Sequence, residues 1–527
     1  LTDAAHSLGV RVFLDIVINH TGWGSVLQEN LPEFFLKNSD GTFASPGAWG
    51  NVWKDLVELE QHDPKLLDII ADSLLIWCRR GTDGFRCDAG YKIPVAAWQY
   101  IIARVQNEFP ETIFLLEGLG GTWEATENLL TEGGMQWAYS ELFQNYSGAE
   151  ISKYLDYSNL QSACVGSYVH YSETHDNNRL AAQRASGILP EEKSSIEKKV
   201  PNRAWSLLRN RLCALTSPSG AFGFTCGVEW LATEKINVHQ CTGLNWGNPE
   251  NIVPELAQLN ELISNHPCFF DGAKLTRLSA PDSPIYALFR ESAEGKDSVL
   301  ILVNTDVEKE NSLVLPQSAI GNRQSAIELL GQPPPEISAG KEKIIFTLPP
   351  GAAFCLASTQ KPVGLSGENY RRARAQAAFA IQALNHILPT EEFSNFDWQF
   401  LAAQIENSPQ GFLAAAGHLR EGRRESWDAD TASLPKEFSA LIEKSARREI
   451  FPNVITWTLI DARRVTPVPA NHWLLIEDSA PFRAELRVEN AGAIHVQSIA
   501  AGNNFIAVFA PQSAAAAELT VERHAAT

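Results

Sequence analysis

The sequence predicts an α/β fold that is built on a parallel β-sheet and is followed by a region of strands. Two observations support this prediction. Before about residue 271, short apolar runs alternate with helical patterns, which is typical of parallel strands joined by right-handed crossovers. After it, the rhythm changes to short β-type segments between turn clusters, which indicates an all-β module.

The first expected strand covers residues 10–18. It is rich in β-branched residues, as are strands that a parallel sheet buries on both faces. The stretch after it, at about 21–58, contains many Gly, Pro, Asn and Trp residues and has no lasting period. A long irregular insertion of this kind is usually functional. Its tryptophans are interpreted as platforms for sugar rings or, alternatively, as the core of a small subdomain.

The later elements alternate in type. We expect apolar strand segments at 84–88, 113–116, 135–139, 168–171 and 221–225, helices at about 64–80, 94–109 and 123–130, and a polar helical stretch that ends near 216. Side chains at the carboxyl ends of parallel strands face a shared crevice. The residues directly after these strands are therefore the candidates for chemistry.

The length of 527 residues predicts more than one domain. We expect a catalytic region at 1–270 that contains the insertion, a β-sandwich at 271–358, a linker and helical segment at 359–450, and a β-rich module at 451–527. The part of the chain after about residue 364 matches no motif that would indicate its role.

Charge and cysteine content narrow the classes of partner. The net charge of −19 argues against nucleic acid or an anionic membrane surface, so a neutral substrate fits better. No apolar run approaches the ~18 residues that a membrane-spanning helix needs. None of the eight cysteines forms a C-x-x-C pair, which favours buried, reduced thiols in a cytoplasmic protein. A disulfide-bonded periplasmic enzyme is the alternative.

Three carboxylates follow buried apolar segments: Asp88, Glu117 and Asp176. Like charges on one rim of a sheet repel, so three acids there are hard to explain by structure alone. A retaining glycosidase needs a carboxylate nucleophile and a protonated carboxylic acid about 5 Å apart. Arg86 lies two residues before Asp88, on the same side of the strand, where it would keep Asp88 ionised. For Asp88 alone, a structural salt bridge is the alternative.

Four segments of the chain resemble the ordered signature regions of the α-amylase superfamily, glycoside hydrolase family 13. They are 15–20, 84–89, 117–118 and 175–176. The resemblance extends to about residue 358 and implies a (β/α)8 TIM barrel followed by a β-sandwich. The strand that carries Asp15 resembles the third barrel strand. We therefore expect an amino-terminally truncated barrel with exposed sheet edges and weak or no activity.

The resemblance also implies roles for individual residues. Asp88 would be the nucleophile, Glu117 the general acid and base, and Asp176 a ligand of the distorted sugar. Arg86 would hold the nucleophile ionised, and the remaining motif residues, Asp15, His20 and His175, would bind hydroxyls or fix the site. The family often has Lys and then His beginning three residues after the nucleophile, whereas this chain has Tyr91 and Lys92. Lys92 is a substrate-binding candidate, and the acceptor subsite stays open.

No cofactor or metal is expected. Asn19 matches a position that often binds calcium in the family, but one side-chain oxygen is far short of a site with six to eight oxygen ligands. Calcium is therefore only an alternative.

These residues predict an enzyme that cleaves α-glucosidic bonds of starch, glycogen or maltooligosaccharides through a covalent glycosyl-enzyme. One alternative is a glucanotransferase or maltosyltransferase with a sugar as acceptor, because both reactions use the same motifs. The other is an inactive barrel that acts as a scaffold or sugar-binding subunit. The three intact carboxylates argue against the inactive barrel.

Overall fold

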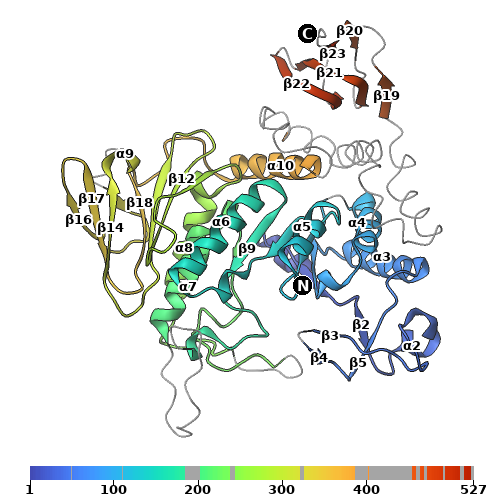
Figure 1. Cartoon of the computed structure of the whole chain (residues 1–527), viewed down its shortest axis with the longest axis horizontal. Coiled ribbons are helices and arrows are strands. Elements are labelled where there is room, and N and C mark those ends of the chain that lie inside the picture. The colour runs from blue at the N-terminus through green and yellow to red at the C-terminus, as the bar shows by residue number, and fades with distance from the viewer. Residues whose placement is uncertain are drawn as a thin grey trace. The chain divides into compact units, whose positions relative to one another are not determined.

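Figure 1 shows the helices and strands of the computed structural model. Its internal contacts divide the chain into two compact units, which are described separately. The structure describes residues 1–48, 50–109, 111–183, 202–237, 244–320, 326–385, 402, 454–458, 463–467, 472–490, 493–510 and 516–523. Most of the expected helical segment at 359–450, part of the polar stretch before residue 202 and Trp49 of the insertion lie outside these ranges.

The first unit contains a parallel sheet with the strand order β1-β6-β7-β8. The strands are β1 (Phe13–Ile16), β6 (Gly84–Cys87), β7 (Ile113–Leu116) and β8 (Trp137–Tyr139). All four residues of β6 are buried, as expected for a strand between two neighbours in a parallel sheet. Its register places Arg86 directly opposite Asp15.

The helices of this unit alternate with its strands along the chain. They are α1 (Thr2–Ser7), α3 (Pro64–Arg79), α4 (Val95–Glu108) and α5 (Trp123–Thr131). The carboxylate of Asp63 accepts a hydrogen bond of 2.8 Å from the Lys65 amide, so it caps the start of α3. The buried residues of α3, from Leu66 to Cys78, recur with helical spacing. Gly81, with a φ of 92°, turns the chain toward β6.

The insertion is more regular than its sequence predicts. The strand β2 (His20–Gly22) pairs antiparallel with β5 (Leu56–Glu58), and β3 (Gly47–Ala48) pairs with β4 (Asn51–Val52). Between them lie α2 (Val26–Asn30) and the 3₁₀ helix η1 (Pro32–Phe34). Strands of two or three residues are too short to produce an alternating pattern, which explains why the sequence shows no period here.

The second unit contains the parallel pair β9 (Ser167–Tyr171) and β10 (Phe222–Gly223). Its long helices are α6 (Gly148–Cys164), α7 (Arg203–Thr216) and α8 (Val253–Asn265). The strand expected at 221–225 is two residues long. Thr225 lies after the end of β10, and its hydroxyl donates a 2.8 Å hydrogen bond to the backbone carbonyl of Glu173.

A β-sandwich forms the rest of the second unit. One sheet has the order β11-β12-β13-β18-β15, and the other has the order β14-β17-β16. The strands are β11 (Lys274–Arg277), β12 (Ile285–Glu291), β13 (Ser298–Asn304), β14 (Asn311–Pro316), β15 (Ile327–Glu328), β16 (Glu336–Ala339), β17 (Lys343–Leu348) and β18 (Ala353–Ala357). The short helix α9 (Gln317–Ile320) follows β14.

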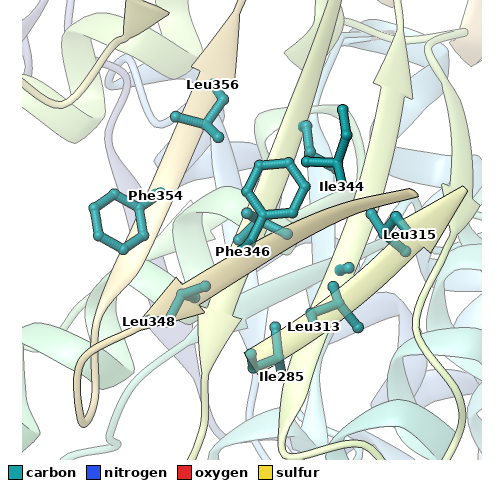
Figure 2. Close-up of a cluster of buried hydrophobic side chains, with 11 residues drawn as sticks. Ile285, Leu313, Leu315, Ile344, Phe346, Leu348, Phe354 and Leu356 are labelled. Carbon is teal, nitrogen blue, oxygen red and sulfur yellow. The ribbon is translucent and has the colours of Figure 1, made fainter. Parts of the chain in front are cut away.

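The core of the sandwich comes from alternate residues of its strands. Leu313 and Leu315 of β14 are buried, whereas Val314 between them is 50% exposed. The same alternation buries Ile344, Phe346 and Leu348 of β17. Figure 2 shows these side chains gathered with Ile285, Phe354 and Leu356 in one cluster. The alternation of strand side chains therefore produces this hydrophobic core.

The described residues that follow the sandwich comprise one helix and a group of strands. The helix is α10 (Glu368–Asn385), and the strands are β19 (Val454–Thr458), β20 (Arg463–Pro467), β21 (His472–Asn490), β22 (Ala493–Ala510) and β23 (Ala516–Arg523). The long strand β21 pairs with β19, β22 and β23.

Two sequence-based expectations bear on membranes and thiols. Among the described residues, no helix combines the length and apolarity needed to span a bilayer. Six cysteines within the described ranges are free thiols, and five of them are buried: Cys78, Cys87, Cys213, Cys268 and Cys355. Cys226 is exposed, so the expectation of buried thiols does not hold for it.

Candidate active site

The guanidinium of Arg86 joins two carboxylates at the carboxyl end of the first unit's parallel sheet. Its Nη1 donates to Asp88 Oδ1 at 2.6 Å and to the two Asp15 oxygens at 2.9 and 3.0 Å. Asp88 directly follows β6, and its amide donates to the Ile16 carbonyl at 3.0 Å. The parallel register of β1 and β6 therefore brings together three of the residues predicted from the sequence.

Arg86 supplies the positive charge of this cluster. It is 8% exposed, and burial alone would lower the pKa of its guanidinium. The hydrogen bonds and negative charges of Asp15 and Asp88 outweigh burial and raise that pKa above its ordinary value. Arg86 is therefore a permanent cation, and it lies against the carboxyl groups of Asp15 and Asp88.

Glu117 lies beside the nucleophile candidate because of the next strand pair. It directly follows β7, and its carboxylate accepts a 2.7 Å hydrogen bond from the Ala89 amide. Ala89 has the left-handed backbone conformation, with φ of 45° and ψ of 35°, which is unusual for a residue with a side chain. This strained turn aims the amide that follows Asp88 at the second carboxylate.

The environment of Glu117 favours its protonated form more than water does. Burial raises the pKa of Glu117, and the charge of Asp88 adds to this effect. The Ala89 amide and the charge of Arg86 act in the opposite direction, but the pKa stays above its usual value. Two neighbouring carboxyl groups thus have different surroundings: Asp88 pairs with the cation of Arg86, whereas the half-buried Glu117 accepts a hydrogen bond from a backbone amide. Such a difference separates a nucleophile from an acid.

His20, Lys92 and Trp53 lie around this pair. Burial lowers the pKa of His20, although the charges of Asp88 and Asp55 oppose it. The centroid of the His20 ring is 5.8 Å from that of Trp53. The ammonium of Lys92 donates to the Gly47 carbonyl and lies 5.6 Å from the centroid of the Trp53 ring. The small strands of the insertion therefore contribute to the site.

His175 and Asp176 belong to the second unit, on the loop after β9. His175 Nε2 is 3.4 Å from Asp176 Oδ2, and Asp176 is exposed. The Asp176 amide donates to the Thr174 hydroxyl at 3.1 Å, which fixes the backbone on one side of this pair.

A buried ion pair that the sequence reasoning missed holds both ends of this loop. Arg179 Nε is 2.6 Å from Glu173 Oε1, and the two side chains are 1% and 2% exposed. The other Glu173 oxygen accepts the Leu180 amide at 2.5 Å. Arg179 also donates to the Cys226 carbonyl at 3.0 Å. The only sequence signal was an acid and an arginine on either side of the His175-Asp176 motif.

Burial raises the pKa of Glu173 to about 7, against the opposing charge of Arg179. The charge of this pair is therefore sensitive to pH near neutrality.

The structure also places the calcium candidate. Asn19 is 1% exposed, and its side-chain nitrogen lies 3.4 Å from His20 Nδ1. The backbone carbonyl of Asn19 accepts a hydrogen bond of 3.0 Å from the Leu59 amide. Over the part of the chain that the structure describes, no three His, Cys, Asp or Glu residues gather as a metal-binding group.

Comparisons with known proteins find related sequences. No family model matches the chain. It is 23% identical over 312 residues to an α-1,4-glucan:maltose-1-phosphate maltosyltransferase of Cereibacter sphaeroides, covering 58% of this chain and 50% of that protein. It is 22% identical over 336 residues to the enzyme of that name in Myxococcus xanthus, covering 61% and 47%. The chain thus spans about half the length of these curated relatives.

A shorter match, 26% identical over 173 residues, is to a cyclomaltodextrin glucanotransferase of Geobacillus stearothermophilus, covering 29% of this chain and 22% of that protein.

Solved structures show the same fold. A maltogenic α-amylase of Thermotoga neapolitana matches with a TM-score of 0.54 at 17% identity, covering 67% of this chain and 79% of the other. An α-amylase of Lactobacillus plantarum matches with a TM-score of 0.51 at 20% identity, covering 68% and 80%. The predicted barrel-type parallel sheet with β-regions after it is confirmed. The four motifs of the chain resemble those of the α-amylase superfamily, and the solved α-amylase structures share its fold.

Proposed function

We propose that this chain is a retaining enzyme that acts on α-glucosidic bonds through a covalent glycosyl-enzyme. One observation carries the proposal. Asp88 is bonded to the guanidinium of Arg86, and the half-buried Glu117 accepts a hydrogen bond from the amide of Ala89, the residue directly after Asp88. A paired carboxylate next to a carboxyl with a raised pKa is the combination that retaining glycoside chemistry requires.

The first step forms the glycosyl-enzyme. A carboxylate oxygen of Asp88 attacks the anomeric carbon, while Glu117 gives its proton to the glycosidic oxygen and the carbon–oxygen bond breaks. Arg86 keeps Asp88 ionised until the new bond forms. Glu117 is then an ionised carboxylate, next to the space that the leaving group has occupied.

In the second step, Glu117 removes a proton from a hydroxyl, and the hydroxyl oxygen attacks the anomeric carbon. The bond to Asp88 breaks, and the carboxylate is regenerated. Water as the acceptor gives hydrolysis, and a sugar hydroxyl gives transfer. Other residues are proposed to bind the sugar hydroxyls or to fix the geometry of the site: Asp15, His20, Lys92, His175 and Asp176. Of these, Asp176 is proposed to bind the distorted sugar ring.

The proposed substrate is an α-glucan or a maltooligosaccharide. Support comes from the names of the relatives, which include two α-1,4-glucan maltosyltransferases and a cyclomaltodextrin glucanotransferase. These names favour transfer as the second candidate reaction. The two reactions differ only in which acceptor occupies the space next to Glu117.

The proposed setting is cytoplasmic, without nucleic acid, membrane, metal or other cofactor. The net charge of −19 supports the absence of polyanionic partners, because it would repel them, and the free thiols support the cytoplasmic setting, because reduced thiols suit that compartment.

The direct test uses α-maltosyl fluoride, because its leaving group needs little protonation and reveals even a slow enzyme. We expect fluoride release by the full chain and loss of that release in Asp88→Asn. Asp72→Asn is the matched control. Asp72 is an exposed carboxylate of α3 that is also paired with an arginine, 2.7 Å from Arg104, but it lies outside the four sequence motifs. Equal release by the unsubstituted chain and Asp88→Asn would refute the proposal and favour an inactive, sugar-binding barrel.

A further inference from the structure

Two tryptophans lie side by side on the second unit, in the described stretches of chain between β10 and α8. Trp246 is 77% exposed, more than Trp23 and Trp77, the other exposed tryptophans of the described residues. Trp230 is half-buried, and its ring centroid lies 5.5 Å from that of Trp246, with the ring planes inclined by 43°. A paired aromatic surface that stays open to solvent is unusual in a folded protein and indicates a ligand.

A tight turn presents Trp246 to solvent. The Asn248 amide donates to the Asn245 carbonyl at 3.1 Å, so Trp246 and Gly247 are the central residues of a β-turn. Gly247 has a φ of 77°, a conformation that suits glycine at the third position of such a turn. The exposure of Trp246 therefore results from a defined backbone geometry.

The same turn is fastened to the backbone of Trp230. The side-chain amides of Asn245 and Asn248 both donate to the Trp230 carbonyl, at 2.9 and 3.1 Å. Leu231, the next residue, is fully buried with a φ of 53°, which costs strain for a leucine. The fold thus maintains an unfavourable backbone that keeps the two indole rings together. We call Trp230 and Trp246 the tryptophan platform.

The surroundings of the tryptophan platform suit an uncharged sugar chain. Indole faces pack on the apolar faces of sugar rings, and the exposed Asn245 has an amide group that can bond to hydroxyls. Because the two rings are inclined by 43°, a chain that lies across both has to turn. An α-1,4-glucan turns from one glucose unit to the next, whereas a β-1,4-glucan is flat. The platform therefore favours an α-glucan.

The chain that leads to the platform shares a support with the loop of residues 175–176. The guanidinium of Arg179 donates to the Cys226 carbonyl at 3.0 Å. A Cβ on Gly227 would lie 2.8 Å from Arg179 Nη2, so the backbone before Trp230 passes directly over this guanidinium. The platform is thereby joined to the loop that the proposed function assigns to the sugar.

We propose that the tryptophan platform is a second glucan-binding site, which holds an α-1,4-linked chain without help from the catalytic carboxyls. The choice of ligand rests on the proposed function. Binding is non-covalent, and the rigid platform loses little conformational freedom when the sugar binds. A long glucan held at this site has a raised effective concentration near the enzyme, an advantage that a short oligosaccharide does not gain.

The test measures binding without turnover, in the full chain that carries Asp88→Asn. Electrophoresis through native gels of increasing glycogen content gives the Kd from the retardation of the protein. Addition of Trp246→Ala is expected to raise the Kd roughly tenfold, the effect of removing one central aromatic contact. Trp246→Phe keeps an aromatic face and should raise it less. Gels that contain hydroxyethyl cellulose, a β-1,4-glucan, should not retard the protein.

Two further variants control for folding and for the loss of any tryptophan. Trp77→Ala is the matched control, because Trp77 is a 43% exposed tryptophan of α3, and it should leave the Kd unchanged. Gly247→Ala keeps both rings and strains only the turn, so it should also weaken binding. Circular dichroism of each variant shows whether a higher Kd comes from unfolding.

The outcomes distinguish this proposal from the proposed function. An equal Kd with and without Trp246→Ala, or equal retardation by glycogen and hydroxyethyl cellulose, would overturn the glucan site. Dissociation of a dimer on Trp246→Ala, with the Kd unchanged, would overturn it in favour of a contact between two copies of this chain. Absence of fluoride release by the unsubstituted chain would overturn the proposed function, and the binding result would be unaffected.

Discussion

The different surroundings of Asp88 and Glu117 determine the chemistry at the residue scale. Asp88 has the Arg86 guanidinium 2.6 Å away, whereas Glu117 is half-buried and accepts an amide hydrogen bond from Ala89. Burial favours the neutral form of a carboxyl, and a neighbouring cation favours the ionised form. These surroundings suit Asp88 to the role of nucleophile and Glu117 to the role of proton donor.

Replacing Glu117 by Gln tests its role as proton donor. We expect turnover of maltoheptaose to fall about 10²–10⁴-fold, the usual contribution of general acid catalysis. Turnover of α-maltosyl fluoride should fall much less in its first step, because fluoride leaves without a proton. Glu124→Gln, an exposed acid of α5, is the control. Equal losses on both substrates would argue against an acid role.

The raised pKa of Glu117 also predicts pH dependence. A general acid works while protonated, so the alkaline limb of the kcat/KM profile should lie above the ordinary pKa of a glutamate. The sign for stability is the same: the contribution of Glu117 to folding is fully present below its unfolded-state pKa. It is lost as the pH rises through the higher pKa of the folded state. A limb that persists unchanged in Glu117→Gln would belong to another group.

At the scale of elements, strand ends and the loops between them set the geometry. Parallel pairing of β1, β6 and β7 could be predicted from apolar runs, and it accounts for the meeting of Asp15, Arg86, Asp88 and Glu117. The left-handed turn at Ala89 could not be predicted, because nothing in an alanine favours that conformation. The short strands of the insertion were missed for lack of period.

The loop of His175 and Asp176 shows another limit of sequence reasoning. Glu173 and Arg179 are six residues apart, so only the folded loop brings them together in a buried pair. Burial of charged side chains is rare unless they are paired, and a sequence does not reveal such pairing. The motif residues were predictable from their resemblance to a family, but the ion pair that fixes their loop was not.

Breaking this ion pair should destabilise the second unit. Arg179→Met leaves the Glu173 carboxylate buried without its cation, so we expect a loss of about 3–5 kcal/mol in the free energy of unfolding. Urea denaturation measures it. Because the pKa of Glu173 is already raised to about 7 by burial, protonation relieves the defect. The loss should therefore be smaller at pH 5 than at pH 8, and a loss independent of pH would contradict this account.

At the scale of the whole molecule, the β-sandwich has a hydrophobic core built from its own strands. The sandwich buries alternate residues of β14 and β17, and Phe346 is 1% exposed in the cluster of Figure 2. The sequence predicted the strands β12, β13 and β17 as short segments between turn clusters. Of these three, β17 alternates between buried and more exposed residues, whereas β12 and β13 are buried along most of their length. Most of the helical segment predicted at 359–450 lies outside the residues that the structure describes.

Phe346→Ala tests the energetic weight of the sandwich core. Removing a buried phenylalanine typically costs about 3–5 kcal/mol, because apolar contacts are lost and a cavity remains. Chemical denaturation should show this loss. Val314→Ala on β14 is the control, since Val314 is 50% exposed and should change stability by less than about 1 kcal/mol. Equal effects of the two substitutions would contradict the assignment of the core.

The central claim is that Asp88 forms a covalent bond to the sugar. A 5-fluoro-maltosyl fluoride forms the glycosyl-enzyme faster than the glycosyl-enzyme breaks down, so it can trap the intermediate for mass spectrometry. After digestion at Arg86 and Lys92, we predict that the added sugar mass lies on the peptide of residues 87–92, which contains Asp88 as its only carboxylate side chain. Fluoride release with the sugar mass on any other peptide would contradict the mechanism.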